Sequence, residues 1–271
     1  MKTRVIVAVI LLPLLLAVVL FAPKFCTAIV FGALAAIASF ELLSATGIVK
    51  AVRLQCYCGI SAFWCVLWGS LSIGYSWLLL GIILFWILLF AEMMASQMKL
   101  SFAKIVACFF AGTVMPLMFG SVVRIHNTDN GRAFILIPFV LAFLSDTGAY
   151  FAGLYLGKHK LAPAISPKKT IEGVVGGVLS AVIGMLLYCL VMEVFFGLDA
   201  NYIYGVFYGL AGAGVGVFGD LCFSVIKRQN DIKDYGNLLP GHGGVLDRFD
   251  SMMLIGPVAE VLLLLLPIAV K

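Results

Sequence analysis

Long apolar runs recur along the whole chain, and they constrain its fold more than any other feature of the sequence. A helix that spans a bilayer needs roughly 20 apolar residues. Runs close to that length follow one another with short polar breaks between them. We therefore expect about nine transmembrane helices, near residues 5–22, 25–46, 54–70, 73–91, 103–122, 133–153, 172–196, 202–226 and 251–270.

The composition excludes a water-soluble domain with a single anchor. Of the 271 residues, 63% are hydrophobic and 11% are charged, and the mean hydropathy is +1.14. A soluble domain carries about 25% charged residues, so the chain has too few charges to cover a soluble surface. Because no linker or low-complexity tract separates the apolar runs, we expect a single all-α, multi-pass membrane domain over residues 1–271.

Two parts of this map have alternatives. Lys2 and Arg4 precede the first apolar run, as in a signal peptide, but no small-x-small cleavage site follows it, so we expect a retained span. The first and second spans, or the third and fourth, could instead form a re-entrant hairpin.

The basic residues favour a cytoplasmic N-terminus. With that orientation, 4 of the 18 lysines and arginines lie on the far side: Lys24, Arg124, Arg132 and Lys271. The other 14 face the cytoplasm, as the positive-inside rule requires: Lys2, Arg4, Lys50, Arg53, Lys99, Lys104, Lys158, Lys160, Lys168, Lys169, Lys227, Arg228, Lys233 and Arg248. The cytoplasmic segments 153–172 and 227–250 are rich in charge, glycine and proline, and we expect the chemistry there.

Four polar residues share one face of the eighth predicted helix. Asp220, Ser224, Lys227 and Arg228 follow one another at helical spacing. Asp220 lies about two turns inside an apolar run, where a carboxylate is costly and is a functional candidate by default. The alternatives are that Asp220 only pairs with a lysine, and that Lys227 and Arg228 only mark the cytoplasmic end of a helix.

Two more aspartates stand where the last predicted span begins. Asp247 and Asp250 are three residues apart, so we expect them on one helix face. Gly243 and Gly244 precede them, next to His242, and let the backbone approach a ligand closely. Carboxylates suit magnesium, and clustered cations suit phosphates, so these residues predict phosphoryl or nucleotidyl transfer. The alternative is that the aspartates only stabilise a helix N-terminus.

The cytoplasmic segment before the seventh span predicts an anion site. We expect Ser166 to cap a helix and Pro167 to begin it. Lys168 and Lys169 then lie in the first turn, where the helix dipole disfavours cations unless an anion is bound. The alternative is a basic patch that contacts anionic lipid headgroups.

Three further features complete the candidates. Asp146, near the cytoplasmic end of its span, could bind metal or substrate, or could serve as a cap or ion-pair partner. The glycine run between Gly205 and Gly219 predicts close helix packing. His126 and His159 have no visible partner, and we assign them no role.

The segment from Ser224 to Asp250 resembles the signature of the phosphatidate cytidylyltransferases, also called CDP-diacylglycerol synthases. The matching positions are Ser224, Lys227, Arg228, Lys233, Asp234, Pro240, Gly241, His242, Gly243, Gly244, Asp247, Arg248 and Asp250. Residues 145–147 and 166–173 also resemble motifs of that family. The resemblance covers roughly residues 140–260, which we take as the catalytic part; the apolar helices of residues 1–130 receive no role.

The resemblance implies that CTP and phosphatidic acid give CDP-diacylglycerol and pyrophosphate. It implies a magnesium requirement, with a second cation left open, and a homodimer in the cell (inner) membrane with a cytoplasmic site. We expect membrane lipids around the protein and no nucleic-acid partner. Asp220, Asp247, Lys227 and Arg228 are the expected catalytic residues. The expected metal ligands are Asp220, Asp247 and Asp250, and the expected substrate contacts are Asp146, Ser166, Lys168, Lys169, Ser224, Lys233, Asp234, His242, Gly243, Gly244 and Arg248.

Two other functions compete with this interpretation. Another CTP-dependent transferase with a different lipid acceptor, such as a polyprenol kinase or an archaeal-lipid cytidylyltransferase, would use similar chemistry. A secondary transporter of an anionic substrate would also carry intramembrane charges, often within inverted repeats. We find no such repeat, and the charges gather at one face of the membrane.

Overall fold

The computed structural model describes residues 13–71, 74–97, 99–238, 241 and 243–270. The chain forms two compact units, which are described separately. The first comprises Met1–Thr128 and Gln229–Phe249, and the second comprises Asp129–Arg228 and Asp250–Lys271. The expected catalytic part, residues 140–260, therefore contributes to both units, and the single membrane domain stays a prediction.

Within the described ranges, six helical stretches are long and apolar enough to cross a membrane. They are Lys24–Thr46, Tyr75–Ala95, Phe102–His126, Gly131–Leu156, Ile171–Phe196 and Tyr202–Gln229. Each lies on one of the expected spans, so the prediction of a multi-pass helical membrane protein is confirmed at this level. Of the other three expected spans, the first begins outside the described residues, and only its part from 13 to 21 is seen as helix.

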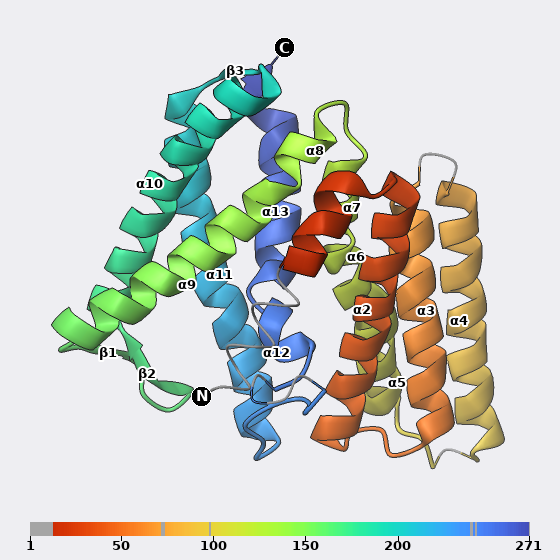
Figure 1. Cartoon of the computed structure of the whole chain (residues 1–271). Helices are drawn as coiled ribbons and strands as arrows, with labels where there is room; N and C mark the ends of the chain where they lie inside the picture. The colour runs from red at the N-terminus through yellow and green to blue at the C-terminus, as the bar shows by residue number, and fades with distance from the viewer. Residues whose placement is uncertain (1–12, 72–73, 98, 239–240, 242, 271) are drawn as a thin grey trace. The chain divides into compact units, whose positions relative to one another are not determined.

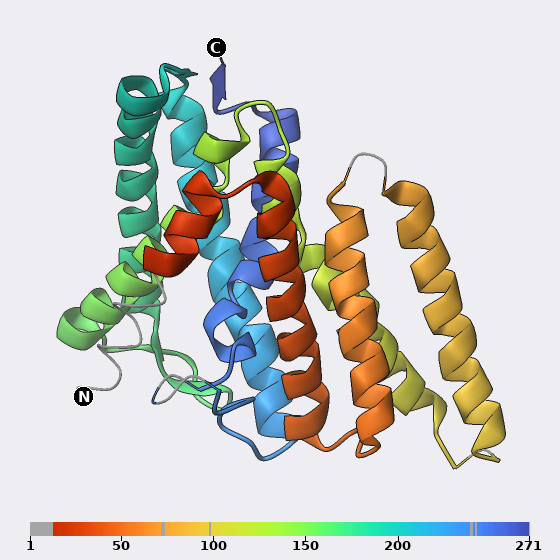
Figure 2. The same cartoon turned by 45° about the vertical axis from the view of Figure 1, so that its right-hand side comes forward.

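The first unit is a bundle of antiparallel helices. Figure 2 shows α3 packed beside α2 and α4 beside α3. The elements are α2 (Lys24–Thr46), α3 (Val52–Gly69), α4 (Tyr75–Ala95), α5 (Phe102–Phe109), a π-helical turn η1 (Phe110–Val114), α6 (Met115–Phe119), α7 (Ser121–His126) and α12 (Leu246–Phe249). In the last of these, the ring of Phe249 packs edge-on against Phe119 at 5.2 Å between centroids, which ties the segment from 229 to 249 to this bundle.

The second unit is built around a long helical hairpin, formed by α9 and α10 (Figure 1). Its elements are α8 (Gly131–Phe134), α9 (Leu136–Leu156), β1 (Lys160–Ala162), β2 (Ser166–Thr170), α10 (Ile171–Phe196), β3 (Asp199–Ala200), α11 (Tyr202–Gln229), α13 (Met252–Leu265) and β4 (Ala269–Val270). The strands pair antiparallel, β1 with β2 and β3 with β4. They therefore close the two ends of α10.

Glycines let α11 approach its neighbours within the second unit. A Cβ added at Gly209 would lie 2.5 Å from the Cα of Val182 on α10, and one at Gly216 would lie 2.8 Å from Ile255 on α13. The clash at Gly209 is with backbone, so that contact needs glycine, whereas at Gly216 the end of the Ile255 side chain would have to shift. Gly214 meets nothing within 4 Å. Close packing is confirmed for most of the glycine run, as small residues commonly provide between membrane helices.

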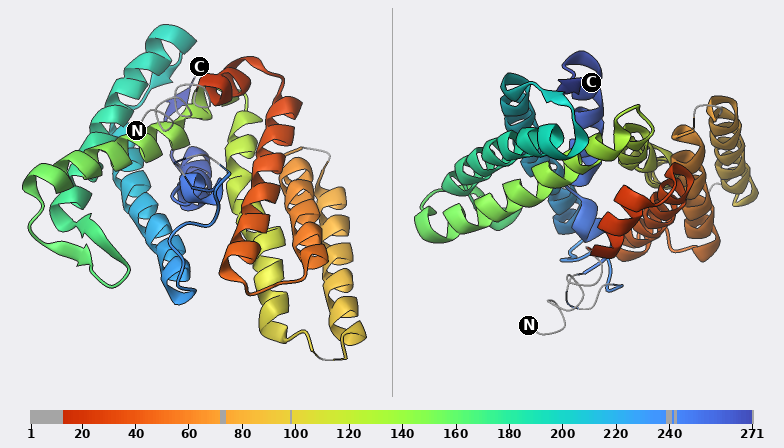
Figure 3. Two further views of the ribbon diagram at one scale, coloured as in Figure 1. Left: turned by 60° about the horizontal axis from the view of Figure 1, so that its bottom comes forward. Right: turned by 45° about the horizontal axis from the view of Figure 1, so that its top comes forward.

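The expected helix start at Ser166 is wrong. Residues Ser166–Thr170 form β2, which pairs with β1 in a hairpin (Figure 3, left). The helix begins at Ile171, and Thr170 is its cap: the hydroxyl oxygen accepts a hydrogen bond from Gly173 N at 3.1 Å. Pro167 fits an edge strand as well as a helix start, because the fixed φ of proline occurs in both conformations. Lys168 and Lys169 therefore lie on a strand, and the helix dipole does not act on them as expected.

Two smaller expectations also change. His159 has a partner after all: its Nδ1 lies 2.6 Å from Oε1 of Glu172, which fastens the strand hairpin to α10. Asp250 lies after the end of α12, so it does not share a helix face with Asp247. The Oδ1 atom of Asp250 accepts a hydrogen bond from Ser251 N at 2.9 Å. Such local bonds compete with helical ones, which explains the break before α13.

Candidate active site

An ion pair joins two of the predicted motifs in the second unit. Lys169 on β2 places its Nζ 2.5 Å from Oδ2 of Asp220 on α11. The strand hairpin β1–β2, which connects α9 to α10, makes this contact possible. Strand β2 runs directly into α10 and holds the lysine beside α11. Fifty-one positions of sequence separate the partners, and no periodic pattern links them. The Asp220 carboxylate inside an apolar helix thus has a cationic partner, as its cost requires.

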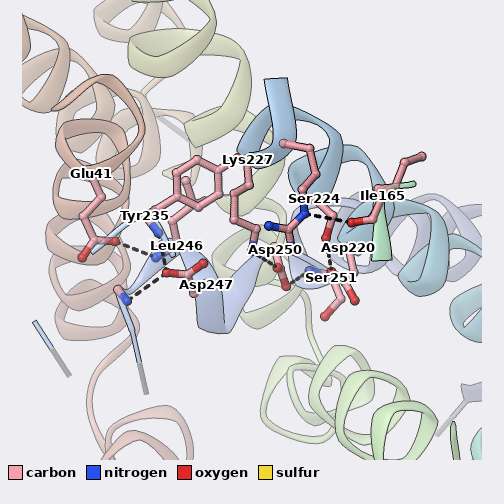
Figure 4. A network of polar contacts seen from close by, with 12 residues as sticks. Glu41, Ile165, Asp220, Ser224, Lys227, Tyr235, Leu246, Asp247, Asp250 and Ser251 are labelled. Carbon is pink, nitrogen blue, oxygen red and sulfur yellow. Dashed lines mark hydrogen bonds and ion pairs between the residues drawn. The ribbon is translucent and has the colours of Figure 1, made fainter. Parts of the chain in front are cut away.

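The predicted face of α11 is confirmed for its first two members. Ser224 lies one turn beyond Asp220, and its Oγ donates to Asp220 Oδ1 at 3.1 Å (Figure 4). Both carboxylate oxygens of Asp220 therefore have a protein donor, one cationic and one neutral. This arrangement holds the carboxylate in a fixed orientation at the end of the helix.

A second lysine–aspartate pair lies two turns further along α11. Lys227 is buried, and its Nζ is 3.8 Å from Oδ2 of the buried Asp250 (Figure 4). Burial raises the pKa of Asp250 to about 7, with the carboxylates of Asp220 and Asp146 adding to the rise and Lys227 opposing it. Burial is the largest cause of this rise, and the repulsion by Asp220 exceeds the attraction by Lys227.

Arg228 supports the strand hairpin. Its Nε donates to the carbonyl oxygen of Ile165 at 3.1 Å, in the turn that leads into β2. The residue is exposed. Arg228 therefore contacts the strand hairpin that carries Lys169, and its assignment as a catalytic residue stays a prediction.

The first unit carries the glycine-rich loop of the signature. Asp247 is buried, and its Oδ2 accepts hydrogen bonds from Tyr235 N at 2.8 Å and Gly244 N at 3.0 Å. Gly243 has a φ of +87°, in the left-handed region. A Cβ there would also make a tight contact of 3.0 Å with Asp247 Oδ2, but the positive φ is the main reason for glycine. The aspartate therefore organises its own loop.

The same loop is held by a residue that the sequence analysis missed. Glu41 on α2 is buried, and its carboxylate accepts hydrogen bonds from Val245 N at 3.1 Å and Leu246 N at 2.9 Å (Figure 4). The signal was present in the sequence: Glu41 is an acidic residue within an apolar run, as Asp220 is. It lies in the part to which we assigned no role.

Most of the remaining predicted contacts lie at the surface of their units. Asp146, Lys168, Lys233, Asp234 and Arg248 are exposed, and Ser166 is half-buried. His242 lies outside the described residues. Their assignments as substrate contacts stay predictions.

The carboxylates of the second unit fit magnesium by their chemistry. Within the described residues, no group of three or more His, Cys, Asp or Glu side chains is arranged to hold a metal. Magnesium, however, is usually bound by one or two carboxylates together with substrate phosphates and water. Asp220 and Asp250 are carboxylates of this kind, and each lies beside a lysine that suits a phosphate. Asp247 belongs to the first unit, and its share in a magnesium site stays a prediction.

Membrane-length helices with lysine–aspartate pairs at the end of one of them define a class: multi-pass membrane proteins with a charged site suited to anionic substrates. Within that class, the chain belongs to the cytidylyltransferase family, whose model matches residues 2–266.

Proteins named phosphatidate cytidylyltransferase are among the relatives of this chain. The chain is 44% identical over 139 residues to that of Staphylococcus epidermidis, covering 51% of this chain and 52% of the relative. It is 42% identical over 156 residues to that of Bacillus subtilis, with 57% and 56% covered. For Staphylococcus aureus the identity is 42% over 139 residues, with 51% and 52% covered. The matches thus span about half the length of these relatives.

Proposed function

We propose that the chain transfers a cytidylyl group from CTP to phosphatidate. An oxygen of the lipid phosphate attacks the α-phosphorus of CTP and forms a new P–O bond. The bond from the α-phosphorus to the oxygen that bridges to the β-phosphorus breaks. The products are CDP-diacylglycerol and pyrophosphate. Family membership and the names of the relatives support this reaction.

The observation that carries the proposal is the ion pair between Lys169 and Asp220. It joins the motif of residues 166–173 to the polar face of α11 that begins at Asp220, within one compact unit. A lysine from the one and a carboxylate from the other are the two components that a phosphate and its metal ion need. An anionic substrate would compete with Asp220 for Lys169.

The chemistry needs charge neutralisation more than proton transfer. A phosphate monoester has a second pKa near 6 and is mostly dianionic at pH 7, so the lipid nucleophile is already deprotonated. The barrier lies in bringing two polyanions together, and preorganised cations lower it. Lys169 and Lys227 are the described lysines held beside carboxylates at this site, and we propose that they bind the phosphates.

Magnesium is part of the proposal. Asp220 and Asp250 would hold it, with Asp247 a predicted further ligand and Asp146 an outer contact. When bound, the ion would neutralise charge on the CTP phosphates. Release of Asp220 by Lys169 would free a carboxylate oxygen for the metal.

We also propose that the chain crosses the cell (inner) membrane nine times, with the N-terminus and the site facing the cytoplasm. Contacts within the first unit support the alternation of spans. Lys24 Nζ donates to the carbonyl oxygen of Asn127 at 3.2 Å, and both residues are expected on the far side. Arg53 pairs with Glu92 at 2.5 Å, and both are expected near the cytoplasmic side. The resemblance further implies a homodimer, which cross-linking in the membrane would test.

The acceptor distinguishes this function from its competitors. Purified protein, magnesium and labelled CTP would be incubated with phosphatidate, with a polyprenol, or with an unsaturated archaeal ether-lipid phosphate. We expect labelled CDP-lipid from phosphatidate at a rate far above that of the other two. Preference for another acceptor would reassign the substrate. Uptake of an anion into proteoliposomes without any cytidylyl transfer would favour a transporter.

A further inference from the structure

Glu41 is a carboxylate buried within an apolar, membrane-length helix. It lies on α2 and is 6% exposed. A charge in such surroundings is costly unless hydrogen bonds satisfy it. Both of its oxygens are satisfied by backbone N–H groups about two hundred residues further along the chain: Oε1 by Val245 and Oε2 by Leu246. No packing requirement explains this choice, since an apolar residue would fill the position without the cost.

Two glycines let the loop close around this carboxylate. A Cβ added at Gly236 would lie 2.4 Å from Glu41 Oε1, and one at Gly244 would lie 2.4 Å from Glu41 Oε2. Any side chain at either position would therefore force the carboxylate or the loop to move and would disturb their contact. Gly236 and the residues from Gly244 to Leu246 therefore leave room for a carboxylate.

The contact acts on the helix that carries Asp247. Helix α12 has four residues, too few to be stable alone. The N–H groups at a helix start have no partner inside the helix. Glu41 accepts from Val245 and Leu246, while Asp247 itself accepts from Gly244. Three successive amides are thus held by two carboxylates, and the orientation of Asp247 depends on both.

We infer that Glu41 is a positioning residue for the signature loop, and that it fixes Asp247 through the first turn of α12. This inference rests on the proposed function for its effect on catalysis. The contacts of both Glu41 oxygens are with amides of the loop, so we assign Glu41 a supporting role and no direct contact with substrate or metal. It gives the apolar N-terminal helices, which the sequence left without a role, a part in the reaction.

The test uses Glu41→Gln in the full-length protein, with Glu92→Gln as the matched control. Both changes remove a carboxylate from a helix of the first unit, but the partner of Glu92 is Arg53 on α3 and not an amide of the loop's described residues. Glutamine keeps one acceptor and turns an NH₂ group toward the other amide. Hydrogen–deuterium exchange would be followed in peptides covering residues 243–249. We expect exchange about tenfold faster in Glu41→Gln, the scale of one lost hydrogen bond to a charged group, and no change in Glu92→Gln.

The catalytic arm measures CDP-diacylglycerol formation. We expect kcat to fall about tenfold in Glu41→Gln, and the magnesium concentration for half-maximal rate to rise, because Asp247 is less well oriented. Against the background of Asp247→Asn, the same change should have little further effect. An equal fall in both backgrounds would mean a merely structural role and would overturn the inference, as would wild-type exchange or wild-type kcat in Glu41→Gln.

A second variant covers a failure of Glu41→Gln to fold. Gly236→Ala keeps the carboxylate and crowds it from the loop, so it should raise exchange and lower kcat in the same way; normal values would overturn the inference. The exchange arm needs no substrate. If the wild-type protein transfers no cytidylyl group, the proposed function fails, while the exchange result still decides whether Glu41 holds the loop.

Discussion

Replacing Lys169 with methionine removes one charge from the site and little volume. In the present structure the ammonium group lies 2.5 Å from Asp220 Oδ2, and it also reaches the carbonyl oxygen of Val217 at 3.5 Å. If Lys169 neutralises a phosphate during transfer, its loss should slow turnover. If it only balances Asp220, its loss should affect stability alone.

The two effects are separated by the assay in which each appears. The side chains of Lys169 and Asp220 are 23% and 31% exposed, so the pair is mostly buried, and loss of one partner of a buried ion pair costs about 3–5 kcal/mol of stability. Such a loss lowers the unfolding temperature and the folded fraction of the sample. Loss of a group that stabilises transition-state charge costs about 2.7–4 kcal/mol, or roughly a hundredfold to a thousandfold in rate. That loss appears in the rate per folded molecule, which a change in stability leaves unaltered.

The assay is the initial rate of CDP-diacylglycerol formation in lipid–detergent micelles, with thermal unfolding measured on the same samples. The control is Lys160→Met, which removes an exposed lysine from the paired strand of the same hairpin. We expect a fall of at least about a hundredfold in Lys169→Met and a near-normal rate in the control. A rate for Lys169→Met within about fivefold of wild type, the range that 1 kcal/mol allows, would refute the reasoning.

Three further predictions concern the carboxylates and the topology. Asp220→Asn and Asp247→Asn should each lower turnover by at least about a hundredfold, and their effects should be non-additive if both residues serve one ion. The rates of the folded variants would be measured over a range of magnesium concentrations, and near-normal rates with an unchanged magnesium dependence would contradict this prediction. The pKa of Asp250 rises from 3.8 to about 7 on folding, so the folded state binds more protons than the unfolded state between these pH values. The free energy of unfolding should therefore fall as pH rises through this range. The unfolding temperature should decline less steeply with pH in Asp250→Asn than in the wild type, and an identical decline would show that Asp250 is not the cause. Cysteines placed near Lys160 and Lys233 should be labelled only from the cytoplasmic side of sealed vesicles, and one near Asp199 only from the other side; labelling of both lysine-rich segments from outside would reject the topology.

The helices could be predicted because the apolar runs are local and repetitive. Asp220 and Ser224 could be paired in advance because residues four apart on a helix are neighbours, and the structure bears this out at 3.1 Å. The glycine run on α11 could likewise be assigned to packing, since small residues at helical spacing have few other uses in a membrane.

The strand hairpin could not be predicted in the same way. Ser166 and Pro167 form a good local signal for a helix start, but Thr170 offers a competing cap four residues later, and the pairing of β2 with β1 decides between them. That pairing depends on the packing of α9 against α10, which is a tertiary contact and leaves no local pattern in the sequence. The contact between Lys169 and Asp220 follows from it and was therefore also out of reach.

Glu41 was missed for a different reason. Its position in an apolar run marked it as unusual, but its partners are backbone amides near Val245, and amides carry no signature in the sequence. Asp250 shows the same limit: the three-residue spacing from Asp247 suggested one helix face, while a single bond to Ser251 N ends the regular pattern there. Side-chain bonds to the backbone decided both cases.

The position of a label in CTP tests the central claim most directly. Purified protein would be given phosphatidate and magnesium with CTP labelled at either the α- or the γ-phosphate. The account predicts that the α-label enters the lipid product, that the γ-label leaves as pyrophosphate, and that the two products form in equal amounts. Transfer of the γ-label to lipid would identify a kinase, and the absence of label from lipid in both cases would contradict the account altogether.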